Sequence, residues 1–278
     1  MMPVARDIAA SGMVAVLPTA SARPYDLLVI TQEGALPPAC AATVSRALVA
    51  GKRVRHVAGF TKEIHGVTDF AHFDLDHLPE GGLTRYRPVK RLADVLAALA
   101  LAPAALALIA VSAAAILATM GGPVFFRQAR VGRAGRVFQI VKLRTMRPAT
   151  AGGGGVPTAI GDERVTPLGR WLRRFHIDEL PQIWNVLTGE MSLVGPRPEQ
   201  AGLVEAYARE LPAFAYRQLV RPGITGWAQV RAPYAADLAE TRVKLGYDLF
   251  YLKHVSPWLD AQICARTVWT LLSGIGAR

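Results

Sequence analysis

The sequence is poor in cysteine, and its histidines are scattered. Cys40 and Cys264 are the two cysteines, and they lie far apart without metal-binding spacing. Free thiols in a reducing compartment are the simplest interpretation. The 6 histidines form no HxxxH pattern, so we expect no zinc site. A basic segment followed by a clean apolar core is missing at the N-terminus, so we expect no signal peptide.

Acidic residues are also few compared with basic ones. The formal net charge is +11 and the pI is about 10.2. Such a balance predicts an anionic partner, which could be a nucleic acid, an anionic lipid or a phosphorylated substrate. Hydrophobic residues make up 51% of the chain, and the mean hydropathy of +0.25 is high for a soluble protein, so a membrane segment is expected.

Charge is absent from the whole stretch between Val95 and Phe126. About 20 apolar residues can cross the hydrocarbon core of a bilayer, so an ordinary spanning helix is one interpretation. However, basic residues flank the stretch on both sides, which would place both ends in the cytoplasm. Pro103 lies within it and bends a helix by removing one hydrogen bond. We therefore predict a re-entrant helix–break–helix over about residues 92–119, with the membrane break at Pro103.

The N-terminal part has the pattern of a small α/β fragment. Strands are predicted at Tyr25–Ile30 and Val54–Phe60, with a helix at Pro37–Lys52 between them. This order indicates one βαβ unit within residues 1–84, and a truncated Rossmann-like domain is one interpretation. No glycine fingerprint follows the first strand, so we predict no nucleotide site there. A regulatory role and a structural role are equally open.

Two adjacent carboxylates, Asp178 and Glu179, stand at the start of a short apolar run. Asp178 is a good N-cap residue, which predicts a helix over about Glu179–Leu187 with Gly189 at its C-terminus. Capping alone, worth about 1 kcal/mol, is one explanation of Asp178. The other is an ionised nucleophile aimed at a phosphorus atom, with Mg²⁺ bound by carboxylate and phosphate oxygens. The local sequence leaves both open.

Several basic residues stand in rigid or regular settings. Lys142 and Arg144 are two apart at a predicted strand, Val137–Leu143, so they point the same way and could hold a diphosphate. A solvated pair at a sheet edge is the alternative. Arg197 lies between two prolines and Arg221 precedes a Pro-Gly turn. A guanidinium on a stiff backbone suits bidentate phosphate recognition, although such prolines can also simply shape loops.

Four long segments together resemble one known family. They read GGPVFFRQARVGRAGRVFQIVKLRTM, LGRWLRRFHIDELPQIWNVLTGEMSLVGPRPE, RPGITGWAQV and YDLFYLKHVSPWLD. In this order they resemble the bacterial sugar transferases, the monotopic polyprenyl-phosphate phosphoglycosyl transferases, over roughly Tyr86 to Leu272. Two departures stand out. The chain has Ala102-Pro103 where the family has Ser-Pro, and it reads RAPYAAD after Val230 where many small members have an Asn-Gly-Arg type stretch, which leaves the sugar unassigned.

The resemblance implies a fold class: an α+β membrane-associated protein with a re-entrant helix and a mainly helical cytoplasmic catalytic domain. Residues 85–278 would form the sugar transferase domain, and residues 120–278 its catalytic part. The implied location is the bacterial inner membrane, with the catalytic domain facing the cytoplasm. Membrane lipid is an implied partner, a homodimer is allowed, and nucleic acid is not expected.

The resemblance also implies a reaction and a set of site residues. A UDP-sugar would give its sugar-1-phosphate to undecaprenyl phosphate through a covalent aspartyl-phosphosugar intermediate. Asp178 and Glu179 would be catalytic and would hold Mg²⁺. Arg173 would bind phosphate, while Arg174 would be a surface charge. The implied substrate-binding and phosphate-binding residues are Lys142, Arg144, Arg173, Arg197 and Arg221.

Other interpretations remain open at this point. His176 could act as a base, or simply be a polar group beside a helix. The glycine-rich loop 149–161 could close over a nucleotide, or serve as a connector. Predicted helices at about Leu238–Lys253 and Pro257–Leu272 carry tryptophans that suit either the lipid interface or a core. For the whole chain, a nucleic-acid binder and a non-catalytic membrane scaffold are the alternatives to an enzyme.

Overall fold

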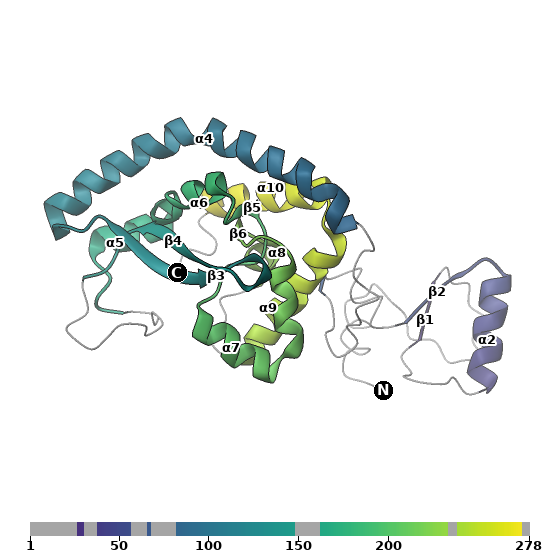
Figure 1. The fold of residues 1–278 in the computed structure, drawn as a ribbon. Helices are drawn as coiled ribbons and strands as arrows, with labels where there is room; N and C mark the ends of the chain where they lie inside the picture. Colours follow the sequence, from purple (N-terminus) through teal and green to yellow (C-terminus); the bar gives the residue numbers. More distant parts are fainter. Residues whose placement is uncertain are drawn as a thin grey trace. The chain divides into compact units, whose positions relative to one another are not determined.

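A computed structural model describes residues 27–30, 38–56, 66–67, 82–147, 162–232 and 238–273. The chain divides into two compact units, Met1–Ala71 and His72–Arg278 (Figure 1). The predicted loop at 149–161 and most of the RAPYAAD stretch lie outside the described residues. Helices form most of the described part of the second unit.

In the first unit, two short strands and one helix are described. Strand β1 (Leu27–Ile30) pairs in parallel with β2 (Arg53–His56), and α2 (Pro38–Val49) connects them. Parallel neighbours need a crossover connection of this kind, because a tight turn cannot bring the chain back to the starting end of the sheet. This is the strand–helix–strand order that the sequence predicts.

The second unit begins with one long helix, α4 (Gly82–Met120). Within its section Tyr86–Met120 a window of 18 residues has a mean hydropathy of 2.4, so the helix is long and apolar enough to cross a membrane, by length and composition. The predicted break at Pro103 is absent, because the helix continues through this residue. A proline inside a helix removes one hydrogen bond and bends the helix without ending it. Figure 1 shows α4 arching over its unit, with both ends turned toward the rest of that unit. The re-entrant path stays a prediction.

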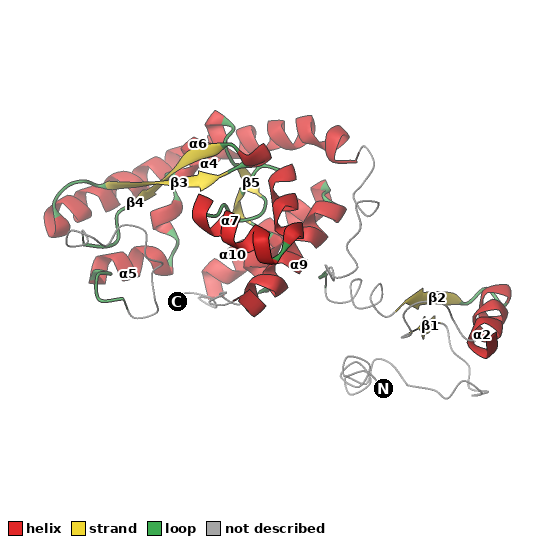
Figure 2. Cartoon of the chain, turned by 60° about the horizontal axis from the view of Figure 1, so that its bottom comes forward, coloured by secondary structure: helices red, strands yellow, loops and turns green. Residues whose placement is uncertain are grey.

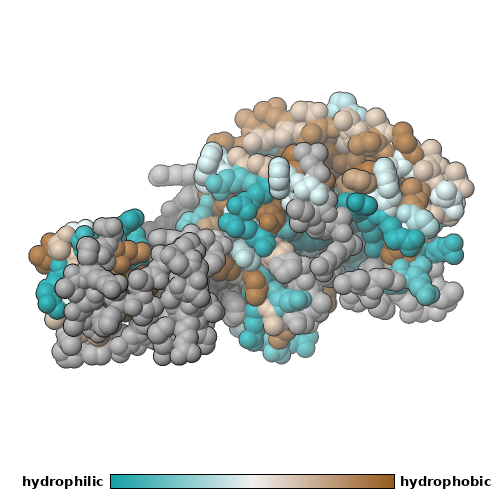
Figure 3. Space-filling view, turned by 180° about the vertical axis from the view of Figure 1, so that it is seen from behind, coloured by the Kyte–Doolittle hydropathy of each residue, from teal (hydrophilic) through white to brown (hydrophobic). Residues whose placement is uncertain are grey.

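One side of α4 packs against the rest of its unit, and the other sides do not. The buried residues recur at helical spacing, as expected for one face; they are Asp94, Ala98, Ala105, Ser112 and Ile116. Ala98 joins a core cluster with Phe138 and Met191. The large apolar side chains elsewhere on α4 are exposed, among them Leu92, Leu99 and Val111. Figure 3 shows apolar surface gathered along this helix, which is consistent with membrane association.

A β-hairpin follows α4. Strand β3 (Phe125–Val131) pairs antiparallel with β4 (Val137–Leu143), and the short 3₁₀ helix η3 (Arg133–Gly135) joins them. The register places Phe126 opposite Lys142. The prediction of a strand at Val137–Leu143 is confirmed. Figure 2, which brings the bottom of the view in Figure 1 forward, shows the two strands in front of α4.

The segment after the hairpin contains two short helices. The first, α5 (Pro167–Arg174), begins where the Thr166 hydroxyl accepts a hydrogen bond from the Gly169 N–H. The second, α6 (Gln182–Thr188), ends at Gly189, which is left-handed with φ 87°. The predicted C-terminus at Gly189 is confirmed.

The predicted start of α6 and the capping role of Asp178 are wrong. Asp178 and Glu179 lie in a separate 3₁₀ turn, η4 (Ile177–Glu179), and α6 begins three residues later. Pro181 has no N–H to donate, and the neighbouring backbone bonds span three residues rather than four, such as Leu180 N–H to the Ile177 carbonyl. The carboxylates therefore sit on a tight turn ahead of the helix.

The remaining elements complete the core around a second, two-stranded parallel sheet. They are β5 (Ser192–Val194), α7 (Ala201–Glu210), η5 (Pro212–Leu219), β6 (Gly223–Thr225), α8 (Trp227–Arg231), α9 (Leu238–His254) and α10 (Pro257–Ser273). Val194, Trp227, Tyr251 and Ile263 form a buried cluster here. Helix α10 buries Ile263 but leaves Trp258 72% exposed and Trp269 70% exposed, so it is a core helix on one side only.

Candidate active site

The site is built on the tight turn between α5 and α6. His176 adopts φ 53°, a left-handed conformation that histidine reaches more easily than most residues, and the chain changes direction there. The turn then closes with a hydrogen bond from the Glu179 N–H to the His176 carbonyl at 3.1 Å. Asp178 and Glu179 are each only 7% exposed. Two adjacent carboxylates are thus buried together, which requires compensating positive charge.

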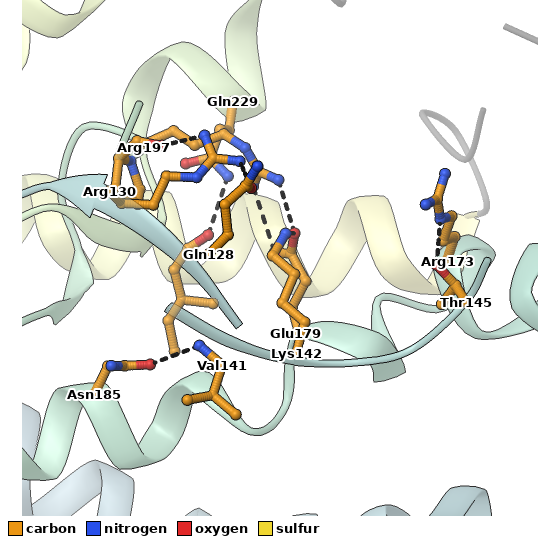
Figure 4. Close-up of polar contacts among 12 residues, drawn as sticks. Gln128, Arg130, Val141, Lys142, Thr145, Arg173, Glu179, Asn185, Arg197 and Gln229 are labelled. Atoms are coloured by element: carbon orange, nitrogen blue, oxygen red, sulfur yellow. Dashed lines mark hydrogen bonds and ion pairs between the residues drawn. The ribbon is translucent and has the colours of Figure 1, made fainter. Parts of the chain in front are cut away.

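Lys142 and Arg197 provide that charge to Glu179. Lys142 Nζ lies 2.6 Å from Glu179 Oε1, and Arg197 Nη2 lies 2.7 Å from the same oxygen (Figure 4). Arg197 Nη1 also donates to Oε2 at 3.4 Å. Burial alone would raise the pKa of Glu179, but Arg197 and Lys142 outweigh it and hold this pKa well below its usual range. Glu179 is therefore ionised and committed to two cations from the hairpin and the Gly-Pro-Arg-Pro segment.

Asp178 is in a different state. No described residue donates a hydrogen bond to its side chain, so its oxygens are uncommitted. Burial, followed by the adjacent Glu179 charge, raises its pKa to about 6, while Lys142, Arg173 and Arg197 act in the opposite direction. At neutral pH most of the population is still ionised. A buried carboxylate that is ionised and has no partner in the described part of the chain is a candidate functional group, because perturbed pKa values gather at functional sites.

Arg173 faces this turn from the end of α5. Its Nε donates to the Thr145 hydroxyl at 2.8 Å, and its charge is among those that lower the pKa of Asp178 (Figure 4). Gly169 makes this placement possible, because a Cβ there would overlap the Thr145 carbonyl. Arg174, in contrast, is exposed beside the Phe175 ring, which fits the expected surface charge.

His176 is exposed, and no described residue bonds to its side chain. Its observed contribution is the left-handed backbone that turns the chain ahead of Asp178. The role as a base stays a prediction without a contact to support it.

Arg144 has partners of another kind. It is 7% exposed and donates to the carbonyls of Met120 at 2.8 Å and Gly122 at 2.9 Å, and also to the Gly121 carbonyl. These are the carbonyls at the end of α4, which have no helical N–H to bond. Arg144 thus closes the C-terminus of α4, while Lys142 binds Glu179. The structure does not bring the two together as a diphosphate pair.

Arg221 is also separated from the two carboxylates. Its Nε donates to the Gly189 carbonyl at 2.8 Å, at the far end of α6 from Asp178. Arg91 donates to the Val186 and Leu187 carbonyls at the same helix end. Among the predicted phosphate-binding residues, Lys142, Arg173 and Arg197 therefore gather near the carboxylates, and Arg144 and Arg221 do not.

Arg217 and Asp248 form a buried pair that supports Arg197 and that the sequence did not predict. Arg217 Nη2 donates to the Arg197 carbonyl at 2.9 Å, and Arg217 Nε donates to Asp248 Oδ2 at 2.7 Å. Asp248 is 2% exposed, and burial raises its pKa although Arg217 opposes this. Thirty-one positions separate the two residues, so the one available signal was an aspartate within the largely apolar part of α9 at 245–252.

The donor set fits Mg²⁺ at Asp178 but not at Glu179. Among the described residues, no group of three or more His, Cys, Asp or Glu side chains could enclose a metal ion. Both Glu179 oxygens already contact cations, whereas those of Asp178 are uncommitted. Mg²⁺ commonly takes one carboxylate together with substrate phosphates and water. Of the two carboxylates predicted to hold the metal, only Asp178 thus remains as a fitting ligand.

Comparison with known proteins identifies the family of the second unit. The family model described as "Bacterial sugar transferase" matches residues 85–274, from the start of α4 to just past the end of α10. The chain belongs to the bacterial sugar transferase family. This match includes every residue of the carboxylate turn and its cationic partners.

Relatives of this sugar transferase carry related names. An Aeromonas hydrophila protein, "UDP-N-acetylgalactosamine-undecaprenyl-phosphate N-acetylgalactosaminephosphotransferase", is 42% identical over 241 residues, which is 84% of this chain and 56% of that protein. A Caulobacter vibrioides "UDP-glucose:undecaprenyl-phosphate glucose-1-phosphate transferase" is 44% identical over 186 residues, 66% of this chain and 70% of its own length. One from Escherichia coli with the same name is 34% identical over 210 residues, 75% of this chain and 44% of its own length. The chain thus spans about half the length of two of these three relatives.

Proposed function

We propose that this chain transfers a sugar-1-phosphate from a UDP-sugar to undecaprenyl phosphate at the cytoplasmic face of the bacterial inner membrane. The observation that carries the proposal is Asp178, a buried carboxylate to which no described residue donates a hydrogen bond, beside Glu179, which two cations hold ionised. The names of the relatives support the two substrates, and the uncommitted carboxylate supports the chemistry. These comparisons give no support to a nucleic-acid binder or an inactive scaffold.

The proposed first step is attack by an Asp178 oxygen on the β-phosphorus of the UDP-sugar. A phosphorus–oxygen bond to Asp178 forms, the bond from this phosphorus to the bridging oxygen breaks, and UMP leaves with the electron pair. In the second step an oxygen of the acceptor phosphate attacks the same phosphorus. The bond to Asp178 breaks, the carboxylate is regenerated, and a polyprenyl-diphosphate sugar is released. A covalent route means that donor and acceptor need not occupy the site together.

The cations around the turn serve this chemistry electrostatically. Charge spreads over the phosphoryl oxygens during transfer, and fixed positive groups stabilise it. Among the described residues Arg173 bonds to Thr145 through Nε alone, which leaves its two Nη groups available for a phosphate. Lys142 and Arg197 add positive potential while holding Glu179 in place. Mg²⁺, with Asp178 as its protein ligand, would neutralise part of the diphosphate charge.

Membrane attachment brings the chain to its acceptor, whose lipid tail stays in the bilayer. The arch of α4, its exposed leucines and the basic residues on both sides of its apolar stretch favour a helix that enters and leaves on one face. The exposed Trp258 and Trp269 of α10 favour contact with the interface, where tryptophan is enriched. Tags placed before and after α4 should therefore report the same compartment. Opposite compartments would establish a spanning helix instead.

A direct test is UMP release from a panel of UDP-sugars, with undecaprenyl phosphate in detergent. At least one sugar should give acceptor-dependent release. Asp178→Asn should lower the rate by about 10⁴-fold or more, as loss of a covalent nucleophile does. The exposed Glu205→Gln on α7 is the matched control and should keep the wild-type rate. Release of UMP by Asp178→Asn at the wild-type rate would refute the proposal. Absence of UMP release with every UDP-sugar of the panel would favour a non-catalytic scaffold.

A further inference from the structure

A basic cavity, separate from the carboxylate turn, lies at the far end of α6 from that turn. It is lined by the first turns of α4, by η3 and by the segment before β6; its polar lining includes Arg87, Lys90, Asp94, Arg133 and Arg221. Gly189, whose carbonyl binds Arg221, comes ten residues after Glu179. Helix α6, with 7 residues, lies between them, and at about 1.5 Å per residue its two ends are on the order of 10 Å apart. A phosphate in this cavity would be too far away for Asp178 to attack.

The positive charge in the cavity exceeds the negative charge. Lys90 is neutralised, because its Nζ lies 2.7 Å from Asp260 Oδ2. Arg87 and Arg221 donate only to backbone carbonyls, those of Leu219 and Gly189. Among the described residues, none forms a hydrogen bond or an ion pair with the Arg133 side chain. Three guanidinium groups thus face one another, and Asp94 is the one carboxylate in the described lining.

These guanidinium groups are close enough to repel one another. Burial lowers the pKa of Arg221, and Arg91 and Arg133 lower it further; Asp94 opposes them, and Arg87 adds a smaller lowering. The pKa of Arg87 is lowered by burial and then by Arg133. Charges of one sign that are collected in a cavity are stabilised when an anion enters, and guanidinium groups favour phosphate geometry.

The surroundings of the cavity are those of a membrane surface. Arg87 precedes the charge-free stretch of α4 by eight residues, which is about 12 Å of helix. Val89, Leu92 and Leu96 are exposed on the same part of the helix. Val255 lines the cavity, and the exposed Trp258 follows three residues later. A lipid whose polar head is bound in this cavity could therefore place its acyl chains along α4.

We propose that this cavity binds the phosphate of an anionic membrane lipid, through Arg87, Arg133 and Arg221. This lipid is neither donor nor acceptor in the transfer reaction, and the inference does not rest on the proposed chemistry. Bound there, the lipid would fix the height of the N-terminal end of α4 at the membrane surface. A soluble phosphate offers the same chemistry but none of the acyl contacts.

The test is thermal unfolding of the full chain, purified in a neutral detergent. It is titrated with short-chain phosphatidylglycerol, short-chain phosphatidylcholine or inorganic phosphate. Phosphatidylglycerol should raise the melting temperature and saturate, whereas the other two should not. Arg133→Ala should weaken the apparent affinity for phosphatidylglycerol at least tenfold, because it removes a charge-assisted hydrogen bond to the phosphate. Arg133 has no described partner, so this variant should fold.

Arg136→Ala is the matched control, because Arg136 follows the same 3₁₀ helix but is exposed and does not line the cavity. It should bind the lipid as the wild type does, and so should Asp178→Asn. Equal weakening by Arg136→Ala would show diffuse surface attraction, and weakening by Asp178→Asn would place the lipid in the catalytic site. Saturation by inorganic phosphate at the same concentration would identify a site for a soluble anion. Each of these results, or no saturation at all, would overturn the proposal.

Discussion

Replacing Asp178 with asparagine should make the folded protein more stable at neutral pH. The pKa of this carboxyl rises from 3.8 to about 6 on folding, mainly through burial. Between these two values the folded state binds more protons than the unfolded state, so the free energy of unfolding falls as pH rises. The loss is small near pH 4, about 0.5 kcal/mol, and reaches about 3 kcal/mol at pH 8. Asparagine has nearly the same shape, carries no charge and escapes this cost.

We therefore expect Asp178→Asn to exceed the wild type by about 1–3 kcal/mol in stability at pH 8, and to match it near pH 4. The assay is thermal or denaturant unfolding in neutral detergent over this pH range. Asp162→Asn is the control of opposite sign, because a hydrogen bond from Arg164 lowers the pKa of Asp162 to about 2. That variant should lose stability above pH 4. If Asp178→Asn is less stable than the wild type at pH 8, or differs by a constant amount, burial of an unpaired charge is the wrong account.

The other predictions concern residues that position the site. Arg217→Met should lower stability by about 3–5 kcal/mol, because Asp248 is left buried and unpaired, and a melting curve checks this. Replacing both Arg217 and Asp248 with apolar residues should recover much of that loss; no recovery would contradict a charge effect. Gly169→Ala should cost about 1–3 kcal/mol and slow UMP release, because its Cβ overlaps the Thr145 carbonyl and pushes α5 away. The exposed Gly202→Ala on α7 should have neither effect.

Much of the local structure was predictable because single residues determine it. Gly189 adopts the left-handed conformation that ends α6, and the alternating, β-branched pattern of Val137–Leu143 forms the expected strand. The start of α6 was not predictable from Asp178 alone, because a good N-cap residue also suits a 3₁₀ turn. Which one forms depended on Pro181 and on bonds that span three residues.

The continuity of α4 was also not predictable from a single residue. Pro103 indicated a break, but a proline can also bend a helix that neighbouring packing supports, and buried Ala98 and Ala105 lie on both sides of it. Its bend was predictable, and its continuity was not.

The candidate site was predictable in its carboxylates and less so in its arginines. A guanidinium group binds a phosphate and the bare carbonyls of a helix end equally well, so spacing could not separate the two uses. Arg197 contacts Glu179, whereas Arg144 closes α4 and Arg221 closes α6. Arg217 supports Arg197 through a contact between elements far apart in the chain, which periodicity does not reveal.

The most direct measurement is mass spectrometry of the peptide that contains Asp178, after the purified chain is incubated with its UDP-sugar in the absence of acceptor. The peptide should gain the mass of one sugar phosphate, and adding undecaprenyl phosphate should remove it. Asp178→Asn should gain nothing. UMP release at full rate without any adduct, or an adduct on another residue, would contradict the covalent role of Asp178.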